Sequence, residues 1–294
     1  MKIAQPASSV LRSFDAFSPP AADLARRAAP VGQVYAKSAG ALSLDCFHYV
    51  PVRRDLSRPP LVCIHGISRN ALEHAHAFRH LADDLGFPVI APMFNQAGFR
   101  GYQTLGSKAG WNALTAFDRL LDEIAAEGGG PSVDIFGFSG GGQFAHRFAM
   151  ARPARVAALA IASAGWYTFP DDARYPRGLA GKLPPGADEA AFLAIPMLVL
   201  VGSADRDRDA TLRQGERINA QQGADRVERA RNWTAAVNDA ARVRGLPPPA
   251  LYAELAGAAH SFADCAAAGL VRRTAEFFHQ RQPRDFRATS GDQK

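Results

Sequence analysis

The sequence predicts a single α/β domain with a mainly parallel sheet flanked by helices. Short runs of apolar and β-branched residues alternate with longer amphipathic segments, which is the pattern of parallel strands joined by crossover helices. Several runs, such as 61–64 and 196–201, are apolar throughout, as strands buried on both faces of a parallel sheet are. The chain has 294 residues, of which 47% are hydrophobic, and no internal repeat or dividing linker, so one large core is expected.

Each element follows from its hydrophobic period: alternation or a continuous apolar run for a strand, and spacing of three to four for a helix. The expected strands are 31–37, 41–50, 61–64, 87–92, 133–136, 156–161, 196–201 and 251–255. The expected helices are 70–85, 111–124, a helix from 142 on, 209–221, 224–244 and 263–280.

Three segments fall outside this alternation. Residues 1–32 are rich in proline and weakly periodic, so we expect an N-terminal arm preceding a domain at 33–281. Residues 282–294 are polar and are expected to form a flexible tail. Residues 163–192 interrupt the alternation with prolines and aromatics, which predicts a short cap or lid insert.

The most informative stretch is 133–150, VDIFGFSGGGQFAHRFAM. A short apolar strand runs into Gly-x-Ser-x-Gly, and a helical pattern follows at once, which is the context of a nucleophile elbow. Glycines at 137 and 141 avoid clashes in so tight a turn, and Ser139 stands at its apex in a strained backbone conformation. We therefore expect Ser139 to be a nucleophile at the positive end of the following helix.

With this motif, the chain resembles the α/β-hydrolase superfamily, and the resemblance extends from about Val34 to Gln280. It implies the α/β-hydrolase fold and a catalytic triad in the chain order serine, acid, histidine. His260 lies in the loop A-H-S-F after the last expected strand, where the superfamily places its histidine, and it is the expected general base. His48, His146 and His279 fit that position poorly.

The resemblance also implies an orienting acid at a strand end that faces the histidine loop. Asp205 stands in G-x-x-D at the end of the penultimate strand and is the expected acid. Asp207 and Asp209 follow closely and could be mistaken for it. In some relatives the acid follows the preceding strand, which leaves Asp171 or Asp172 as the alternative.

An oxyanion hole is implied by the same resemblance. The turn His65-Gly66-Ile67-Ser68 follows the strand at 61–64, and the superfamily uses the turn at this place. The expected donors are the backbone N–H groups of Gly140 and of Ile67, with Ser68 as the alternative to Ile67.

The insert carries aromatic residues that could line a substrate pocket. Trp166, Tyr167 and Phe169 are the candidates for an acyl or alcohol pocket. The same three side chains could equally fasten an irregular loop to the core.

Charge and histidine content bear on which partners and cofactors are expected. The net charge of +6 comes mostly from arginines interspersed with acids, so we expect a basic surface and no nucleic-acid partner. His74, His76 and His80 invite comparison with a metal site, but zinc needs three or four converging ligands. No metal and no cofactor are therefore expected, and these histidines are assigned to a solvated helix face.

Three cysteines without a disulfide pattern fit free thiols in a reducing cytoplasm. The N-terminal residues show no apolar secretory core, and no segment reaches the length of a membrane span. We therefore expect a cytoplasmic protein without a membrane span, and the missing secretory signal argues against an extracellular polymer as substrate.

The expected activity is that of a serine hydrolase cleaving a small-molecule carboxylic ester, or a related acyl bond, through an acyl-enzyme. Acyl transfer, thioester cleavage and polyester depolymerisation would use the same triad and remain alternatives. A non-catalytic ligand-binding protein on a hydrolase fold is the alternative from another class. The substrate and the oligomeric state do not follow from the sequence.

Overall fold

The computed structural model describes residues 30–38, 44–106 and 112–280. Most of the expected N-terminal arm, the expected tail and the first residue of the helix expected at 111–124 lie outside these residues. The division into arm, domain and tail therefore stays a prediction.

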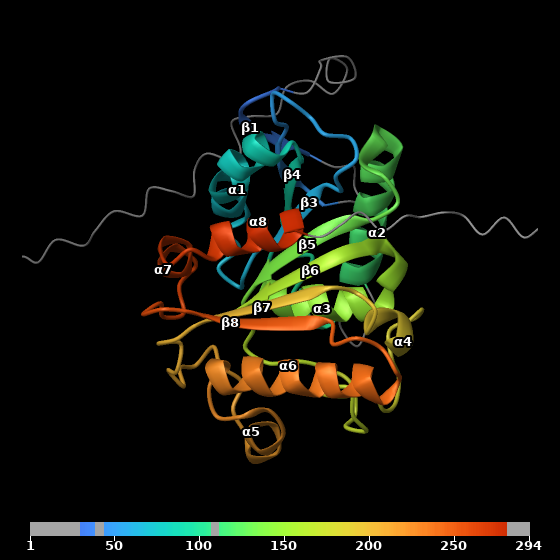
Figure 1. Ribbon diagram of the computed structural model, residues 1–294, viewed down its shortest axis with the longest axis vertical. Coiled ribbons are helices and arrows are strands. Elements are labelled where there is room, and N and C mark those ends of the chain that lie inside the picture. Colours follow the sequence, from blue (N-terminus) through green and yellow to red (C-terminus); the bar gives the residue numbers. More distant parts are fainter. Residues whose placement is uncertain (1–29, 39–43, 107–111, 281–294) are drawn as a thin grey trace, which may run out of the picture. The chain divides into compact units, whose positions relative to one another are not determined.

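The described chain forms an eight-stranded, mainly parallel sheet with helices on both faces (Figure 1), as expected. The strand order is β1-β2-β4-β3-β5-β6-β7-β8. The β1–β2 and β2–β4 pairs are antiparallel, and the pairs from β4–β3 to β7–β8 are parallel. The strands are β1 (Val34–Lys37), β2 (Cys46–Tyr49), β3 (Leu61–Ile64), β4 (Val89–Pro92), β5 (Val133–Phe138), β6 (Val156–Ala162), β7 (Met197–Gly202) and β8 (Ala250–Leu255).

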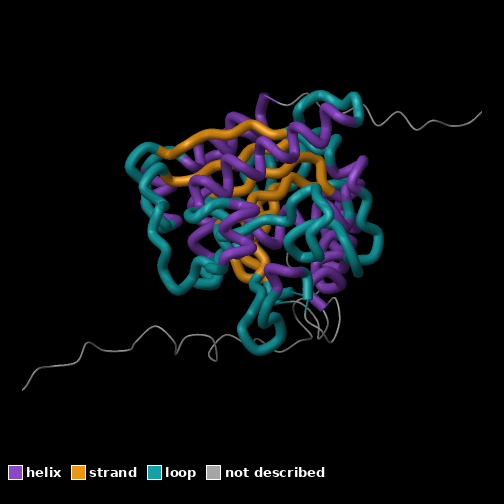
Figure 2. The backbone as a smooth tube through the Cα atoms, turned by 90° about the horizontal axis from the view of Figure 1, so that it is seen from below, coloured by secondary structure: helices purple, strands orange, loops and turns teal. Residues whose placement is uncertain are grey.

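The helices lie in two layers around the sheet (Figure 2). The α-helices are α1 (Ala71–Leu85), α2 (Asn112–Ile124), α3 (Gly140–Ala151), α4 (Glu189–Phe192), α5 (Glu216–Gln222), α6 (Arg226–Val243), α7 (Phe262–Ala267) and α8 (Leu270–Gln280). Short 3-10 or π turns occur at η2 (Tyr102–Thr104), η3 (Ala125–Gly129) and η4 (Pro153–Arg155). None of the described helices has the combination of length and apolarity that a bilayer span requires.

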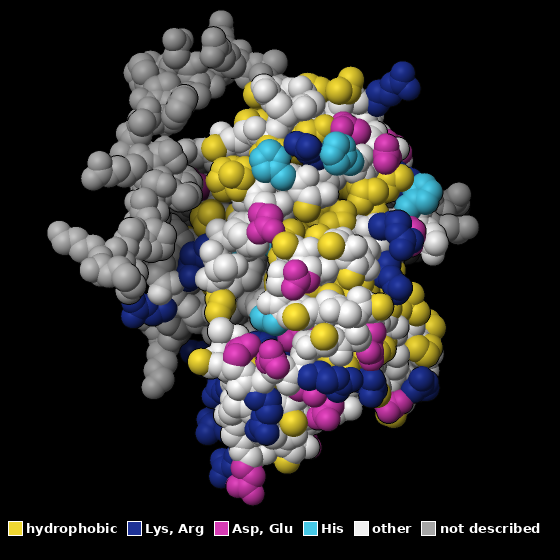
Figure 3. Space-filling model, turned by 90° about the vertical axis from the view of Figure 1, so that its left-hand side faces the viewer, with side chains coloured by type: hydrophobic (Ala, Val, Ile, Leu, Met, Phe, Trp, Pro, Cys, Tyr) yellow, Lys and Arg dark blue, Asp and Glu magenta, His cyan; other side chains and the backbone are white. Residues whose placement is uncertain are grey.

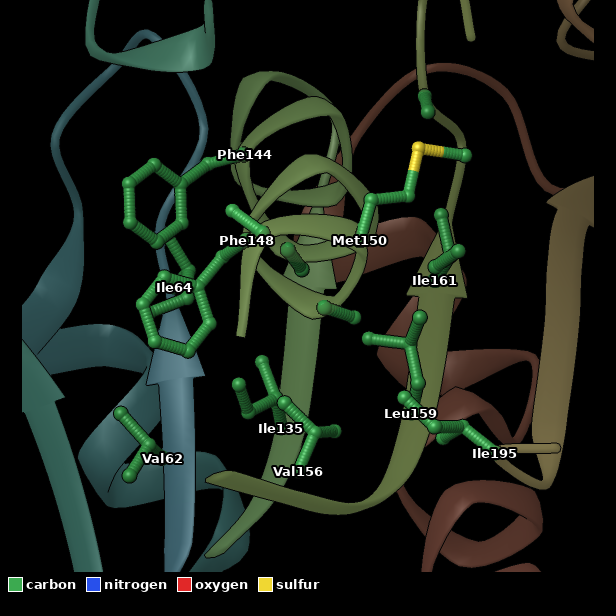
Figure 4. Packing of buried hydrophobic residues seen from close by; sticks show 14 of the residues in the cluster. Val62, Ile64, Ile135, Phe144, Phe148, Met150, Val156, Leu159, Ile161 and Ile195 are labelled. Atoms are coloured by element: carbon green, nitrogen blue, oxygen red, sulfur yellow. The ribbon is translucent and has the colours of Figure 1, made fainter. Parts of the chain in front are cut away.

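Alternate residues of the central strands supply two apolar cores, one on each face of the sheet. Val62, Ile64 and Ile135 pack against α3 (Figure 4), in a core to which residues of α2 and α6 also contribute. Their neighbours Cys63 and Phe136 point to the other face, beneath α1, α7 and α8. Burial on both faces explains why these strands read as continuous apolar runs in the sequence.

Two predicted helices differ from the observed ones. The helix expected at 209–221 is present only as α5, because the Asp209 carboxylate accepts hydrogen bonds from the amides of Thr211 and Leu212 and so favours a turn over a helix. The single helix expected at 263–280 is divided into α7 and α8 at Gly269, whose φ of 92° does not fit a helix.

The prediction that three histidines lie on a solvated face of α1 is wrong for one of them. His76 and His80 are exposed, but His74 is fully buried. Its ring stacks on Phe262 with the ring centroids 4.0 Å apart, and it also contacts Phe136. The neutral imidazole of His74 is an aromatic ring and can pack among other aromatic rings. It therefore occupies a core position on α1, although the sequence pattern had assigned it to the solvated face.

Candidate active site

Ser139 occupies a strained turn between β5 and α3. Its φ of 53° and ψ of −115° are unusual for a residue with a side chain. Glycines on either side make the turn feasible: a Cβ on Gly137 would overlap the carbonyl oxygen of Gly141, and one on Gly141 would overlap that of Ile64. The turn is fixed to the sheet by a 2.8 Å hydrogen bond from the Ser139 N–H to the Ala162 carbonyl.

Ser139, His260 and Asp205 form a continuous hydrogen-bonded chain. The Ser139 Oγ lies 3.0 Å from His260 Nε2, and His260 Nδ1 lies 2.8 Å from Asp205 Oδ2. A carboxylate oxygen only accepts, so Nδ1 carries the proton and Nε2 faces the serine hydroxyl as an acceptor. The arrangement leaves His260 able to take a proton from Ser139.

The acid and the histidine loop are held together by close backbone approach. A Cβ on Gly202, the last residue of β7, would overlap the Ala258 carbonyl oxygen. The Ala204 N–H donates to that same oxygen at 3.0 Å. Because the end of β7 lies directly against the loop after β8, Asp205 and His260 are brought within hydrogen-bonding distance.

Two of the other acids that the sequence left open bond elsewhere. The Asp209 carboxylate accepts from Thr211 and contacts Arg226. Asp171 accepts from the Ala173 amide and from Gln221.

The other histidines also lie apart from Ser139. His48 is in β2, and His279 is beside Arg58 near the end of α8. His146 is buried in α3, where its ring nitrogens contact the Gly142 carbonyl and the Thr168 amide.

The turn after β3 lies against the elbow. A Cβ on Gly66 would be 3.4 Å from Ser139 Cβ, and one on Gly140 would be 3.1 Å from Ile67 Cγ2. The two expected oxyanion donors therefore sit on adjacent segments beside the serine. Gly140 opens α3, so its N–H is one of the first-turn donors that have no partner within the helix.

His65 braces this turn, a role that the sequence reasoning missed. Its Nε2 accepts from the Phe94 N–H at 3.0 Å, so its Nδ1 donates to the Gly66 carbonyl at 2.7 Å. Burial lowers the pKa of His65 to about 4, which keeps the ring neutral and able to accept. The buried Tyr102 hydroxyl completes the brace by donating to the His65 carbonyl at 2.7 Å.

A cavity of about 450 Å³ opens over Ser139 and His260. Its lining is partly apolar and includes Phe138, whose ring stacks on His260 with centroids 5.7 Å apart. The described residues that line it are Gly66, Ile67, Ser68, Asn70, Glu73, Phe138, Ser139, Thr211, His260, Ser261, Phe262 and Ala263. This lining contains one carboxylate, that of Glu73, and no lysine or arginine.

The three aromatic pocket candidates do not line this cavity. Tyr167 and Phe169 belong to the buried core on the α3 and α6 side. Trp166 is nearly buried, with the Arg147 and Arg213 guanidinium carbons 4.2 and 4.9 Å from its ring. In this structure the three aromatic side chains fasten the insert to the core, which was the alternative to a role in the substrate pocket.

Arg226 is a further residue that sequence reasoning missed. Its side chain is 1% exposed, and its Nη1 lies 3.3 Å from Asp205 Oδ1, on the side of the carboxylate away from His260. A possible sequence signal was an arginine in the first turn of a helix, where the helix dipole disfavours a cation.

Across residues 30–38, 44–106 and 112–280, no three His, Cys, Asp or Glu side chains converge as metal ligands would. On the face drawn in Figure 3, basic side chains are interspersed with acidic ones rather than gathered in one patch.

Comparison with known proteins agrees with this geometry. A family model described as the alpha/beta hydrolase fold matches residues 59–187. The poly(3-hydroxybutyrate) depolymerase LpqC from Bordetella parapertussis is 28% identical, with 86% of this chain and 92% of that chain covered and a TM-score of 0.68. Poly(aspartic acid) hydrolase-1 from Sphingomonas sp. KT-1 is 26% identical, covering 82% and 98% of the two chains, with a TM-score of 0.67.

More distant structures share the fold alone. An esterase from Pyrobaculum calidifontis is 16% identical, with 85% and 86% of the chains covered and a TM-score of 0.52. A search of curated protein sequences gives no match. The family model, the sheet order and these relatives together show that the chain has the α/β-hydrolase fold.

Proposed function

We propose that this protein is a serine hydrolase that cleaves a carboxylic ester, or a closely related acyl bond, through an acyl-enzyme. The α/β-hydrolase fold, with esterase and depolymerase neighbours, supports hydrolase activity in general. The observation that carries the finer proposal is the Ser139–His260–Asp205 chain at the floor of an open cavity. Three side chains from three separate loops meet in the order and geometry of a triad.

In the proposed reaction, His260 Nε2 accepts the Ser139 proton while the Oγ attacks the substrate carbonyl. Asp205 holds the imidazole and stabilises the imidazolium that forms. The N–H groups of Ile67 and Gly140 are the proposed donors to the oxyanion. The leaving group departs with the proton from His260, and a water molecule activated by the same nitrogen releases the acid.

The cavity charge supports an uncharged acyl substrate over a polyanionic one. The carboxylate of Glu73 lies in a lining that contains no lysine or arginine among the described residues. A substrate with several carboxylates, such as poly(aspartic acid), would meet a like charge and no cation in this lining. A neutral ester, of the kind found in poly(3-hydroxybutyrate), carries no such penalty, and the partly apolar lining suits it.

The cellular setting that we propose is a reducing cytoplasm. The three cysteines, Cys46, Cys63 and Cys265, are all buried free thiols. Free thiols persist in reducing compartments, which supports this assignment.

Labelling with a fluorophosphonate probe tests the function directly. The wild type is expected to be labelled and to hydrolyse neutral nitrophenyl esters, while Ser139→Ala is expected to lose both properties. Ser57→Ala is the matched control, because Ser57 is exposed and its hydroxyl bonds to Asp55, apart from the elbow. Activity retained by folded Ser139→Ala would overturn the proposal, and product analysis with an added alcohol would separate hydrolysis from acyl transfer.

A further inference from the structure

The carboxylate of Asp205 is completely buried, and two cations or potential cations contact it. Its side chain is 0% exposed, with His260 on Oδ2 and Arg226 on Oδ1. A buried carboxylate stays charged only when it is paired and hydrogen-bonded. The guanidinium of Arg226 is the permanent positive charge that compensates Asp205.

Arg226 is placed for this contact at a cost to its own helix. It is the first residue of α6, where the helix dipole disfavours a cation. The helix start is nevertheless well defined, because the Asp225 side chain caps it by accepting from the Glu228 N–H at 2.9 Å. An arginine that violates the local preference in a well-built helix start points to a task at the site it faces.

The same guanidinium also reaches the cavity wall. Its Nη2 donates to the Thr211 hydroxyl at 2.7 Å, and Thr211 lines the cavity over Ser139. Its Nη1 contacts the Asp207 carbonyl at 3.2 Å. The planar fork of Arg226 therefore fixes the acid and the loop after β7 as one unit.

We propose that Arg226 is a positioning residue for the reaction: it compensates the buried charge of the Asp205 carboxylate and fixes the orientation of that carboxylate toward His260. The inference rests on the proposed function. Without the guanidinium, the uncompensated negative charge of Asp205 would stabilise protonated His260. His260 would then take up a proton at a higher pH than in the wild type.

Other titratable and charged groups face the pair from several elements. They are Asp207, Asp209 and the Arg206–Asp225 ion pair near the loop after β7, Tyr167 of the insert, Cys265 of α7, and Glu73 of α1 across the cavity. Burial raises the pKa of Tyr167, and it raises that of Cys265 to about 11, so both stay neutral. Burial tends to raise the pKa of Asp209, but hydrogen bonds from Thr211 and Arg226 outweigh it and lower this pKa to about 2.

The test is the pH dependence of kcat/KM for a neutral nitrophenyl ester, measured on the full chain. Arg226→Gln removes the charge and retains a donor. We expect the acidic limb of the profile to move up by about one pH unit, with kcat reduced roughly tenfold because the acid is less well held. Arg226→Lys keeps the charge without the fork, so its limb should stay in place while kcat falls.

Arg229→Gln is the matched control. Arg229 is also buried in α6, but it donates to the Gly223 and Gly165 carbonyls and to Asn219, not to Asp205. Its loss should lower the melting temperature and leave the acidic limb unchanged. A limb shift as large as that of Arg226→Gln would mean that the effect is structural and would overturn the proposal.

Asp209→Asn provides a test of opposite sign that keeps both members of the buried pair, although Asp209 itself contacts Arg226. Removing this partly exposed negative charge should move the acidic limb slightly down. If Arg226→Gln does not fold, an upward shift in Asp209→Asn or in Arg226→Lys would overturn the inference. Absence of labelling and turnover in the wild type would refute the proposed function itself, whereas turnover with an unshifted Arg226→Gln profile would refute only the role of Arg226.

Discussion

Four buried histidines should make this fold sensitive to mild acid. Burial lowers the pKa of His48 and of His65 to about 4, that of His74 to about 3, and that of His146 well below its usual range. Each is neutral in the folded protein, whereas in the unfolded chain it titrates with a pKa of about 6.5. Below that pH the unfolded state binds more protons, so stability falls as the pH falls from about 6.5 toward 4.

The magnitude follows from the fraction of protonated unfolded chain. At pH 5.5, one unit below the unfolded pKa, each such histidine destabilises the fold by about 1.4 kcal/mol relative to neutral pH. Four of them together give a loss of about 5 kcal/mol, which is comparable with the whole stability of many domains. Urea unfolding at pH 7.5 and pH 5.5, followed by circular dichroism, measures the difference.

His74→Leu isolates one of these contributions. Neither ring nitrogen of His74 has a hydrogen-bond partner among the described residues, and leucine has a similar volume. This variant should therefore be more stable at pH 7.5 by about 1 kcal/mol. Its loss of stability between pH 7.5 and 5.5 should be smaller than that of the wild type by about 1.4 kcal/mol. His76→Leu is the control, since His76 is exposed on the same helix. A wild-type pH dependence in His74→Leu, or an equal change in His76→Leu, would refute the reasoning.

Two further predictions concern the site. Gly141→Ala should lose turnover and about 3 kcal/mol of stability, because the added Cβ would overlap the Ile64 carbonyl oxygen. Gly98→Ala is the control and should be tolerated, since its Cβ would meet only a side-chain oxygen at 3.3 Å. Wild-type activity in Gly141→Ala would contradict the tight elbow. Glu73→Lys should raise kcat/KM for an anionic ester relative to a neutral one by roughly tenfold at low salt. The gain should shrink at high salt, where charges are screened. An unchanged ratio of the two kcat/KM values would show that the cavity charge does not select substrates.

The sequence alone was sufficient for the parts of the site that depend on local geometry. A buried strand, Gly-x-Ser-x-Gly and a helix can meet only in a tight turn, so the position of Ser139 followed from spacing. The superfamily resemblance then supplied Asp205 and His260. The structure places His260 within hydrogen-bonding distance of both Ser139 and Asp205. The central strands were equally predictable, because burial on both faces requires continuous apolar runs.

Tertiary structure decided what depends on packing between distant segments. The α1 histidines look alike in sequence, but only His74 faces Phe262, which lies nearly two hundred residues away along the chain. Nor did the sequence indicate that Arg226 would pair with Asp205, because the contact exists only after α6 has packed beside β7. Periodicity reports which side of an element is apolar. A buried charge or imidazole is tolerated only where the folded chain supplies suitable contacts for it. Those contacts come from segments far apart in sequence.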